Sequence, residues 1–139
     1  MRRLIWRQPR YAALCCALLS VLMLPAAAAG EQFDAKVIGV ADGDTLTVLF
    51  VDGQAKTPRR VRLSGIDAPE KAQAFGSVAR EQLSRLAFGR VGHLDCRAVD
   101  QYGRSVCMVR VDGVDVGMRM VELGLAWHYK GSPRFQCNK

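Results

Sequence analysis

Three Asp-Gly pairs separate segments in which apolar and polar residues alternate, and this pattern constrains the fold more than any other feature of the chain. The pairs are Asp42-Gly43, Asp52-Gly53 and Asp112-Gly113. Asp-Gly is a preferred sequence for tight turns between antiparallel strands, and alternation is typical of strands with one buried face. The pattern therefore predicts short antiparallel strands joined by tight turns.

The order of the expected elements indicates the fold class. Strands are predicted at residues 37–40, 45–50, 60–66, 91–99 and 105–111, with a loop from Gly53 to Pro58. One-sided apolar spacing predicts a helix over residues 77–87 with Ser77 as its cap, and a second helix over residues 116–123 that ends at Gly124. We therefore expect an α+β, mainly β fold: a five-stranded Greek-key barrel with about two helices against it.

The first 29 residues have the order of parts found in an export signal. Arginines occupy four of the first ten positions, and no acidic residue precedes Glu31. An apolar run over residues 11–24, a proline and four alanines at residues 26–29 follow. The apolar run is short for a membrane span, so a cleaved signal peptide is favoured over an uncleaved anchor. We expect residues 1–29 to be removed and residues 30–139 to form one domain, periplasmic or secreted.

Without those residues the chain keeps 16 cations and 13 anions, a net charge of +3, which permits a nucleic-acid partner without requiring one. It also keeps Cys96, Cys107 and Cys137. If residues 100–103 form a hairpin loop, Val99 opposes Arg104, Ala98 opposes Ser105, and Cys96 opposes Cys107. An exported protein would favour a Cys96–Cys107 disulfide worth ~3 kcal/mol; two buried free thiols are the alternative.

Charged residues gather where two strands are expected to end. Asp67 and Glu70 lie three positions apart around Pro69, with Arg62 upstream, and Asp44 begins another apolar strand. Carboxylate oxygens are the ligands that hard cations prefer, and Asp44 at an apolar position requires a cation or hydrogen-bond donors. Each residue also has a simpler interpretation: Asp67 as a turn residue, Arg62 as a strand-surface cation, and Arg104 as a surface partner of Asp100.

Four short segments, taken in order, resemble the staphylococcal nuclease (thermonuclease) family over about residues 36–129. They are residues 40–45 (VADGDT), residues 62–70 (Arg-Leu followed by IDAPE), residues 100–104 (DQYGR) and residues 124–126 (GLA). The resemblance implies an OB-fold barrel and Ca²⁺-dependent hydrolysis of phosphodiester bonds in DNA and RNA, with 3′-phosphorylated products. We also expect a preference for single-stranded substrates, and a monomer.

The resemblance also implies roles for individual residues. Asp44, Asp67 and the backbone carbonyl of Ala68 would bind Ca²⁺, and Glu70 would orient or deprotonate the attacking water. Arg62 and Arg104 would hold the phosphate, whose negative charge repels hydroxide unless cations and donors offset it. Tyr102 would contact a phosphate, while Trp127 and Tyr129 would stack on a base or close the end of the barrel.

The chain also departs from the family pattern. Gln101 replaces a common lysine, Ala68 replaces a common threonine, and the loop after Glu70 is short. The family usually continues into a further helix after the position of Tyr129, and Pro133 with the short remainder predicts that this C-terminal helix is missing. The alternative function is therefore a catalytically weak OB-fold module that binds single-stranded nucleic acid or a protein.

Overall fold

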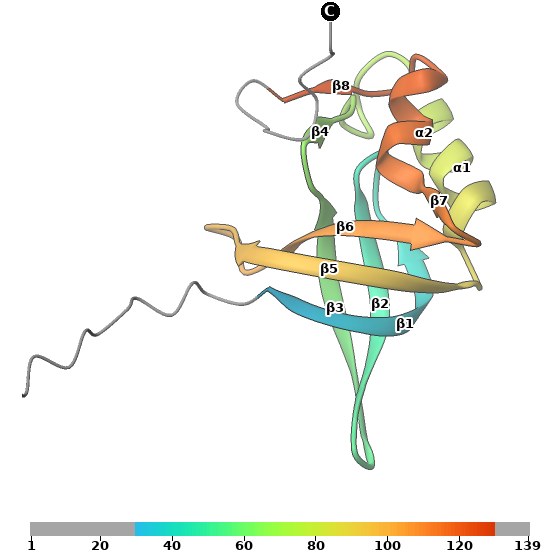
Figure 1. Ribbon diagram of the computed structural model, residues 1–139. Coiled ribbons are helices and arrows are strands. Elements are labelled where there is room, and N and C mark those ends of the chain that lie inside the picture. Colours follow the sequence, from blue (N-terminus) through green and yellow to red (C-terminus); the bar gives the residue numbers. More distant parts are fainter. Residues whose placement is uncertain (1–29, 130–139) are drawn as a thin grey trace, which may run out of the picture.

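Five long strands form a closed barrel in the computed structural model, which describes residues 30–129 (Figure 1). They are β1 (Glu31–Val40), β2 (Thr45–Asp52), β3 (Ala55–Leu63), β5 (Val91–Val99) and β6 (Ser105–Val111). The neighbour order is β3-β2-β1-β5-β6, every pairing in it is antiparallel, and a parallel pairing of β3 with β6 closes the barrel. The five-stranded OB-fold barrel with two helices is thereby confirmed.

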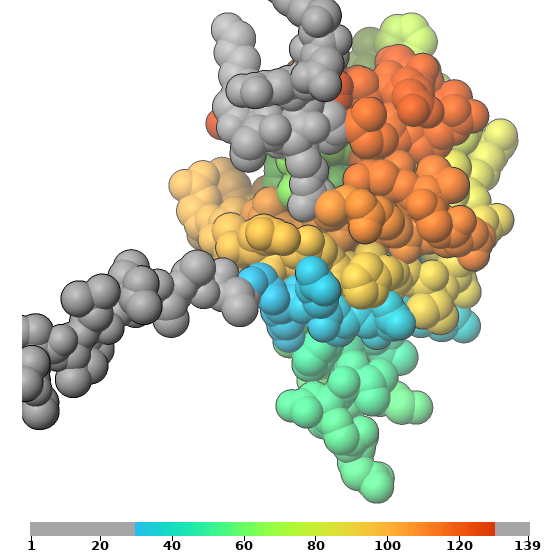
Figure 2. Space-filling model, in the orientation of Figure 1, coloured from blue at the N-terminus to red at the C-terminus, as the bar shows by residue number. Residues whose placement is uncertain are grey.

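Shorter elements complete one end of the barrel. β4 (Ile66–Asp67) pairs with β8 (Trp127–His128), and β7 (Val114–Asp115) turns back to pair antiparallel with the end of β6. The helices α1 (Gly76–Ala87) and α2 (Val116–Glu122) lie together at this end, while the β2–β3 hairpin projects from the opposite end (Figures 1 and 2). Within residues 30–129, no helix is long and apolar enough to cross a membrane.

Alternation along the strands determines which side chains enter the barrel. The fully buried apolar side chains of β2 and β3 are Leu46, Val48 and Val61, with Leu63 only 2% exposed. On α1, Ala79, Leu83 and Ala87 are buried at helical spacing, and Met120 of α2 is buried with them. Because the odd positions of β3 face the core, its even positions, including Arg62, lie on the outer face of the barrel.

The expected loop from Gly53 to Pro58 is wrong. β2 and β3 are joined by a two-residue turn at residues 53–54, since Asp52 already pairs with Ala55, and Gly53 provides the positive φ of 57° that the turn needs. Pro58 is tolerated within β3 because this part of the strand pairs only with β2; pairing with β6 begins at Val61. β3 also ends earlier than predicted, at Leu63, and β1 begins earlier, at Glu31.

The prediction that Ser77 caps the first helix is also wrong. α1 begins at Gly76, and its N-terminal cap is Phe75, which has a φ of 62° and makes no side-chain capping bond. A Cβ atom at position 76 would collide with the backbone carbonyl of Glu70. The close return of the chain from Glu70 to Gly76 therefore sets where the helix begins.

The hairpin of β5 and β6 differs from its predicted register near the loop. Cys96 opposes Cys107 as expected, but a bulge between Cys96 and Ala98 makes Val99 oppose Ser105 rather than Arg104. Cys96 and Cys107 form a disulfide. Because the bulge takes up one residue of β5, Arg104 faces Asp100 instead of Val99, and the N–H of Asp100 donates to the carbonyl of Arg104 at 2.9 Å.

The predicted signal peptide (residues 1–29), the predicted absence of a C-terminal helix beyond Tyr129, and Cys137 all lie outside the residues that the structure describes.

Reduction of the disulfide should lower the free energy of unfolding by about 3 kcal/mol, because the Cys96–Cys107 bond closes a loop with a sequence separation of 11 and so restricts the unfolded chain. Urea unfolding with and without a reductant measures the difference. A Cys96→Ala/Cys107→Ala variant should be insensitive to the reductant. Equal stability of the oxidised and reduced wild type would contradict this prediction.

Candidate active site on the outer face of the barrel

Asp44 is the most buried charged residue at the site and stands directly before β2. Its side chain is 6% exposed. One oxygen, Oδ1, accepts a hydrogen bond from the hydroxyl of Thr45 at 2.9 Å, and Oδ2 accepts one from the backbone N–H of Ala68 at 3.3 Å. The Asp42 carboxylate accepts the backbone N–H of Asp44 at 3.0 Å and so shapes the turn that delivers it. The sequence predicts that Asp44 needs hydrogen-bond donors at this apolar position, and the fold supplies them.

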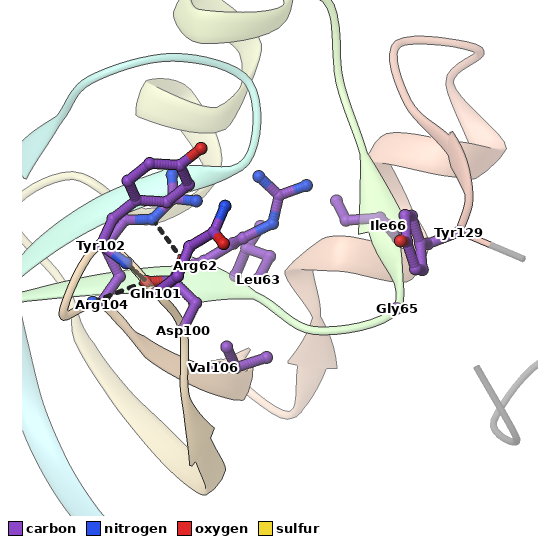
Figure 3. Close-up of a pocket in the computed structure, with 10 residues that line it drawn as sticks. All are labelled: Arg62, Leu63, Gly65, Ile66, Asp100, Gln101, Tyr102, Arg104, Val106 and Tyr129. Atoms are coloured by element: carbon purple, nitrogen blue, oxygen red, sulfur yellow. Dashed lines mark hydrogen bonds and ion pairs between the residues drawn. The ribbon is translucent and has the colours of Figure 1, made fainter. Parts of the chain in front are cut away.

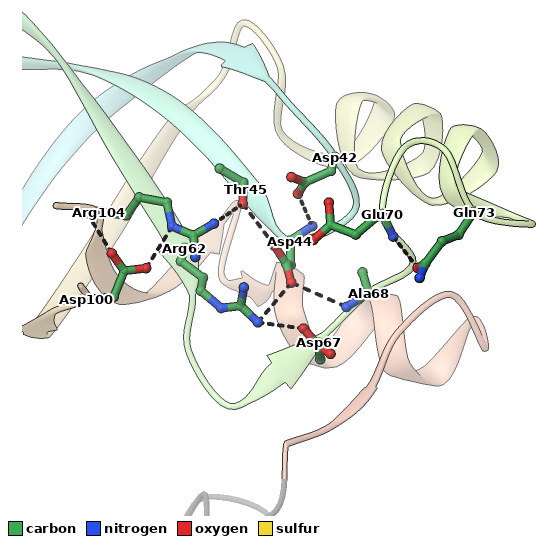
Figure 4. A network of polar contacts seen from close by, with 10 residues as sticks. All are labelled: Asp42, Asp44, Thr45, Arg62, Asp67, Ala68, Glu70, Gln73, Asp100 and Arg104. Carbon is green, nitrogen blue, oxygen red and sulfur yellow. Dashed lines mark hydrogen bonds and ion pairs between the residues drawn. The ribbon is translucent and has the colours of Figure 1, made fainter. Parts of the chain in front are cut away.

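Arg62 stands between two carboxylates (Figure 4). Its Nη2 lies 2.6 Å from Oδ1 of Asp67 and 3.3 Å from Oδ2 of Asp44. Asp67 reaches this position because β3 ends at Leu63 and the chain turns back at Gly65, which has a φ of 78°. The Arg62 side chain is 24% exposed, so one side of the guanidinium remains open to solvent.

Burial raises the pKa of Asp44 to about 6, and the nearby Asp42 carboxylate adds to the effect, while Arg62 and the Thr45 hydrogen bond lower it. The effect of burial on the pKa is larger than the opposing effects of Arg62 and Thr45. The Asp44 carboxylate therefore lies in an environment with too little positive charge, even with Arg62 beside it.

Arg104 is held by Asp100 at the loop between β5 and β6. Its Nε donates to Oδ2 of Asp100 at 2.7 Å, and its Nη1 donates to the hydroxyl of Thr45 at 3.2 Å. Partial burial alone would raise the pKa of Asp100, but hydrogen bonds from Arg104 and Tyr102 outweigh it and hold this pKa below its usual value. Arg104 is therefore both a partner of Asp100 and, through Thr45, a neighbour of Asp44.

Glu70 lies on the short loop before α1. Its backbone N–H donates to Oε1 of Gln73 at 2.7 Å, and its carbonyl accepts the N–H of Gln73 at 2.8 Å. The Glu70 side chain is exposed, and its carboxylate has no hydrogen bond or ion pair within residues 30–129. Its backbone is thus fixed while its carboxylate stays available.

Two hollows of ≈ 400 Å³ each meet at Arg62, Tyr102 and Arg104. The first, shown in Figure 3, is lined by these three and by Leu63, Gly65, Ile66, Asp100, Gln101, Val106 and Tyr129. The second adds Arg60 and Glu70 to the same three residues. Tyr102 and Tyr129 thus lie at the candidate site, whereas Trp127, which is 52% exposed and opposite Asp67 in the small β4–β8 sheet, lines neither hollow.

The acidic side chains of the site supply only some of the oxygen ligands that a hard cation needs. Among residues 30–129, no group of three or more His, Cys, Asp or Glu residues is placed to hold a metal ion. Asp44 and Asp67 nevertheless converge on one point, now taken by Nη2 of Arg62, and both supply oxygen. Two converging carboxylates fit a divalent cation that prefers oxygen ligands and completes its shell with a carbonyl and water.

Arg60 was not identified from the sequence as a site residue. It lines the hollow that contains Glu70, next to Arg62 on the outer face of β3. The alternation of side chains along β3 could have indicated Arg60, because residues two apart in a strand, such as 60 and 62, lie on the same face. The sequence places Thr45 in a strand and in the segment of residues 40–45 but assigns it no role, although its hydroxyl donates to Asp44 and accepts from Arg104.

Comparison with known proteins identifies the family. The model of the family described as "Staphylococcal nuclease homologue" matches residues 60–139, more than half of the chain. Together with the barrel and the cluster around Arg62, this match shows that the chain belongs to the staphylococcal nuclease family.

Individual relatives agree with this assignment. A Haemophilus influenzae protein named "Uncharacterized endonuclease" is 35% identical over 117 residues, which cover 84% of this chain and 64% of the relative. "Protein ParB" of Escherichia coli is 39% identical over 129 residues, and "Micrococcal nuclease" of Shigella flexneri is 36% identical over 128 residues. Each of these two matches covers 86% of this chain and 71% of the relative.

Asp44→Asn should reveal the raised pKa of Asp44 as a pH-dependent difference in stability. In the folded protein the pKa of Asp44 is about 6, against 3.8 for an ordinary aspartate. The contribution of this group to stability is therefore complete below the lower pKa and is lost as pH rises through the higher one. Asparagine does not titrate. With a chelator present, the stability of the variant relative to wild type should rise by on the order of 2 kcal/mol between pH 4 and pH 7. Urea unfolding at both pH values provides the check, and a pH-independent difference would count against the raised pKa.

Proposed function

We propose that this protein is an exported, Ca²⁺-dependent nuclease that hydrolyses phosphodiester bonds of single-stranded DNA and RNA with little sugar specificity, yielding 3′-phosphorylated products. Removal of residues 1–29 would leave it periplasmic or secreted, as a monomer. Nuclease activity is named for two of the relatives above, and membership of the family supports a nucleic-acid substrate.

One observation carries the proposal: the Glu70 carboxylate, without a partner among the described residues, lines the same hollow as the guanidinium groups of Arg62 and Arg104. A module that only binds nucleic acid gains nothing from a carboxylate there, because it repels phosphate. A hydrolase needs both: cations for the phosphate oxygens and a base for the water.

Each side chain has a defined task in this proposal. Arg62 and Arg104 bind the phosphate through rigid guanidinium forks, and their partners Asp67 and Asp100 hold them in position before substrate arrives. Glu70 accepts the proton of the attacking water. Asp44, Asp67 and the carbonyl of Ala68 would hold Ca²⁺, which would supply charge neutralisation at the phosphate.

The aromatic residues support a preference for single strands. Tyr102 is 73% exposed and Tyr129 is 64% exposed, and both line the first hollow beside Arg62. Exposed aromatic rings next to a phosphate site allow unpaired bases to stack, which a duplex does not permit. Trp127 would stack only on a base that extends past this hollow.

Glu70→Gln should reduce turnover of heat-denatured DNA by about 10²–10⁴-fold with excess Ca²⁺, because the amide has nearly the same shape but cannot accept the proton. Circular dichroism and thermal unfolding should match the wild type, since the fixed part of Glu70 is its backbone. Glu81→Gln is the matched control: Glu81 is an exposed glutamate of α1, paired with Arg85 and absent from both hollows.

Unchanged hydrolysis by Glu70→Gln would refute the role of Glu70 as base. If the folded wild type binds oligonucleotides but does not cleave them with or without Ca²⁺, the proposal fails and the OB-fold binding module takes its place.

A further inference from the structure

Arg60 adds a positive charge to the site. No acidic side chain within residues 30–129 forms an ion pair with it. Arg62 is paired with Asp44 and Asp67, and Arg104 is paired with Asp100. Arg60 is exposed and has neither an ion pair nor a hydrogen bond from its side chain in the described part of the chain, although it lines the same hollow as Glu70. Its guanidinium group is thus free to bind an anion there.

The register of the sheet places Arg60 one step along β3 from Arg62. Arg62 is opposite Thr45 of β2 and Arg60 is opposite Thr47, so both side chains rise from the outer face with a spacing of ~6.8 Å along the strand. Arg104 precedes β6, whose Ser105 lies beside Val61, and its side chain reaches Thr45 (Figure 4). Arg60 and Arg62 thus stand on β3, and Arg104 reaches over the same face from the residue before β6, so the three arginines form one cluster around the second hollow.

The two hollows differ in the side chains that line them beside this cluster of arginines. The hollow with Tyr129, Gly65 and Ile66 offers an aromatic ring and apolar atoms, whereas the hollow with Arg60 and Glu70 is lined only by charged side chains and Tyr102. Bases and sugars suit the first, and a phosphate suits the second.

We propose that Arg60 forms a second phosphate subsite, which binds the phosphate next to the scissile one on the side away from Tyr129. This inference rests on the proposed nuclease function. Neighbouring phosphates of an extended single strand are separated by a distance comparable to that between same-face residues of a β-strand, so a chain whose scissile phosphate lies at Arg62 and Arg104 delivers the next one to Arg60. The subsite makes the enzyme prefer substrates with at least two phosphates.

Kinetics on two substrates test the subsite. The thymidine dinucleotide TpT has a single phosphate, while an oligothymidylate has several. Arg60→Gln should raise KM for the oligothymidylate about five- to tenfold at low salt, with kcat nearly unchanged, and should leave kcat/KM for TpT as in the wild type. Arg60→Lys retains the charge and should restore most of the loss.

Arg110 provides the matched control, because it is an exposed arginine of β6 that has no ion pair in the described residues and lines neither hollow. Arg110→Gln should behave as the wild type on both substrates. Equal losses for Arg60→Gln and Arg110→Gln, equal losses on TpT and oligothymidylate, or no loss at all would overturn the subsite.

Binding without cleavage separates this proposal from the proposed function. With a chelator, fluorescence anisotropy of a labelled oligothymidylate should give a plot of log K against log salt concentration whose slope is smaller by about 0.7 in Arg60→Gln than in the wild type. If the wild type never cleaves but the slope falls in this way, the nuclease proposal fails and the phosphate subsite stands. An unchanged slope, or a wild type that does not bind, overturns the subsite whatever the nuclease assay shows.

Discussion

The ion cluster that Arg62 forms with Asp44 and Asp67 is the interaction on which the rest of the candidate site depends. Asp44 is almost completely buried, and its carboxylate is tolerated there because Arg62, the Thr45 hydroxyl and the Ala68 N–H all face it. Removing Arg62 would leave the Asp44 carboxylate without a positively charged partner inside the barrel wall. The same contacts fix the end of β3, the turn into β4 and the start of β2 relative to one another, so the fold and the site are stabilised by the same atoms.

The cluster also explains how a site with two converging carboxylates can bind a phosphate. In the proposed function, Asp44 and Asp67 would hold the divalent cation and Arg62 would hold the phosphate, so each charged side chain would keep a partner of opposite charge. Arg104 is connected to this cluster by Thr45, whose hydroxyl accepts a hydrogen bond from Arg104 and donates one to Asp44. Glu70 supplies a carboxylate that takes no part in this network. It lies on the loop that passes so close to Gly76 that there is no room for a Cβ atom at position 76.

Much of this arrangement could be predicted from the sequence, because it rests on local patterns. The Asp-Gly turns, the alternation in residues 45–50 and 105–111, the Cys96–Cys107 opposition and the resemblance at residues 62–70 led to the barrel and to most of the site. The bulge at Arg97 could not be predicted, since no glycine or proline marks it, and it decides that Arg104 faces Asp100 rather than Val99. Gly76 was missed as the start of α1 because its role depends on a tertiary contact with Glu70. Arg60 looks like an ordinary surface cation until the barrel places it beside Arg62.

Calorimetric titration of Ca²⁺ at pH 8, without nucleic acid, tests the central claim that Arg62 occupies the place where a cation would bind. The wild type is compared with Arg62→Gln, with thermal unfolding to verify that the variant is folded. Because the glutamine removes a positive charge that both carboxylates now face, the account predicts that Arg62→Gln binds Ca²⁺ more tightly than the wild type while losing hydrolysis. Weaker or unchanged Ca²⁺ binding by the folded variant would contradict it.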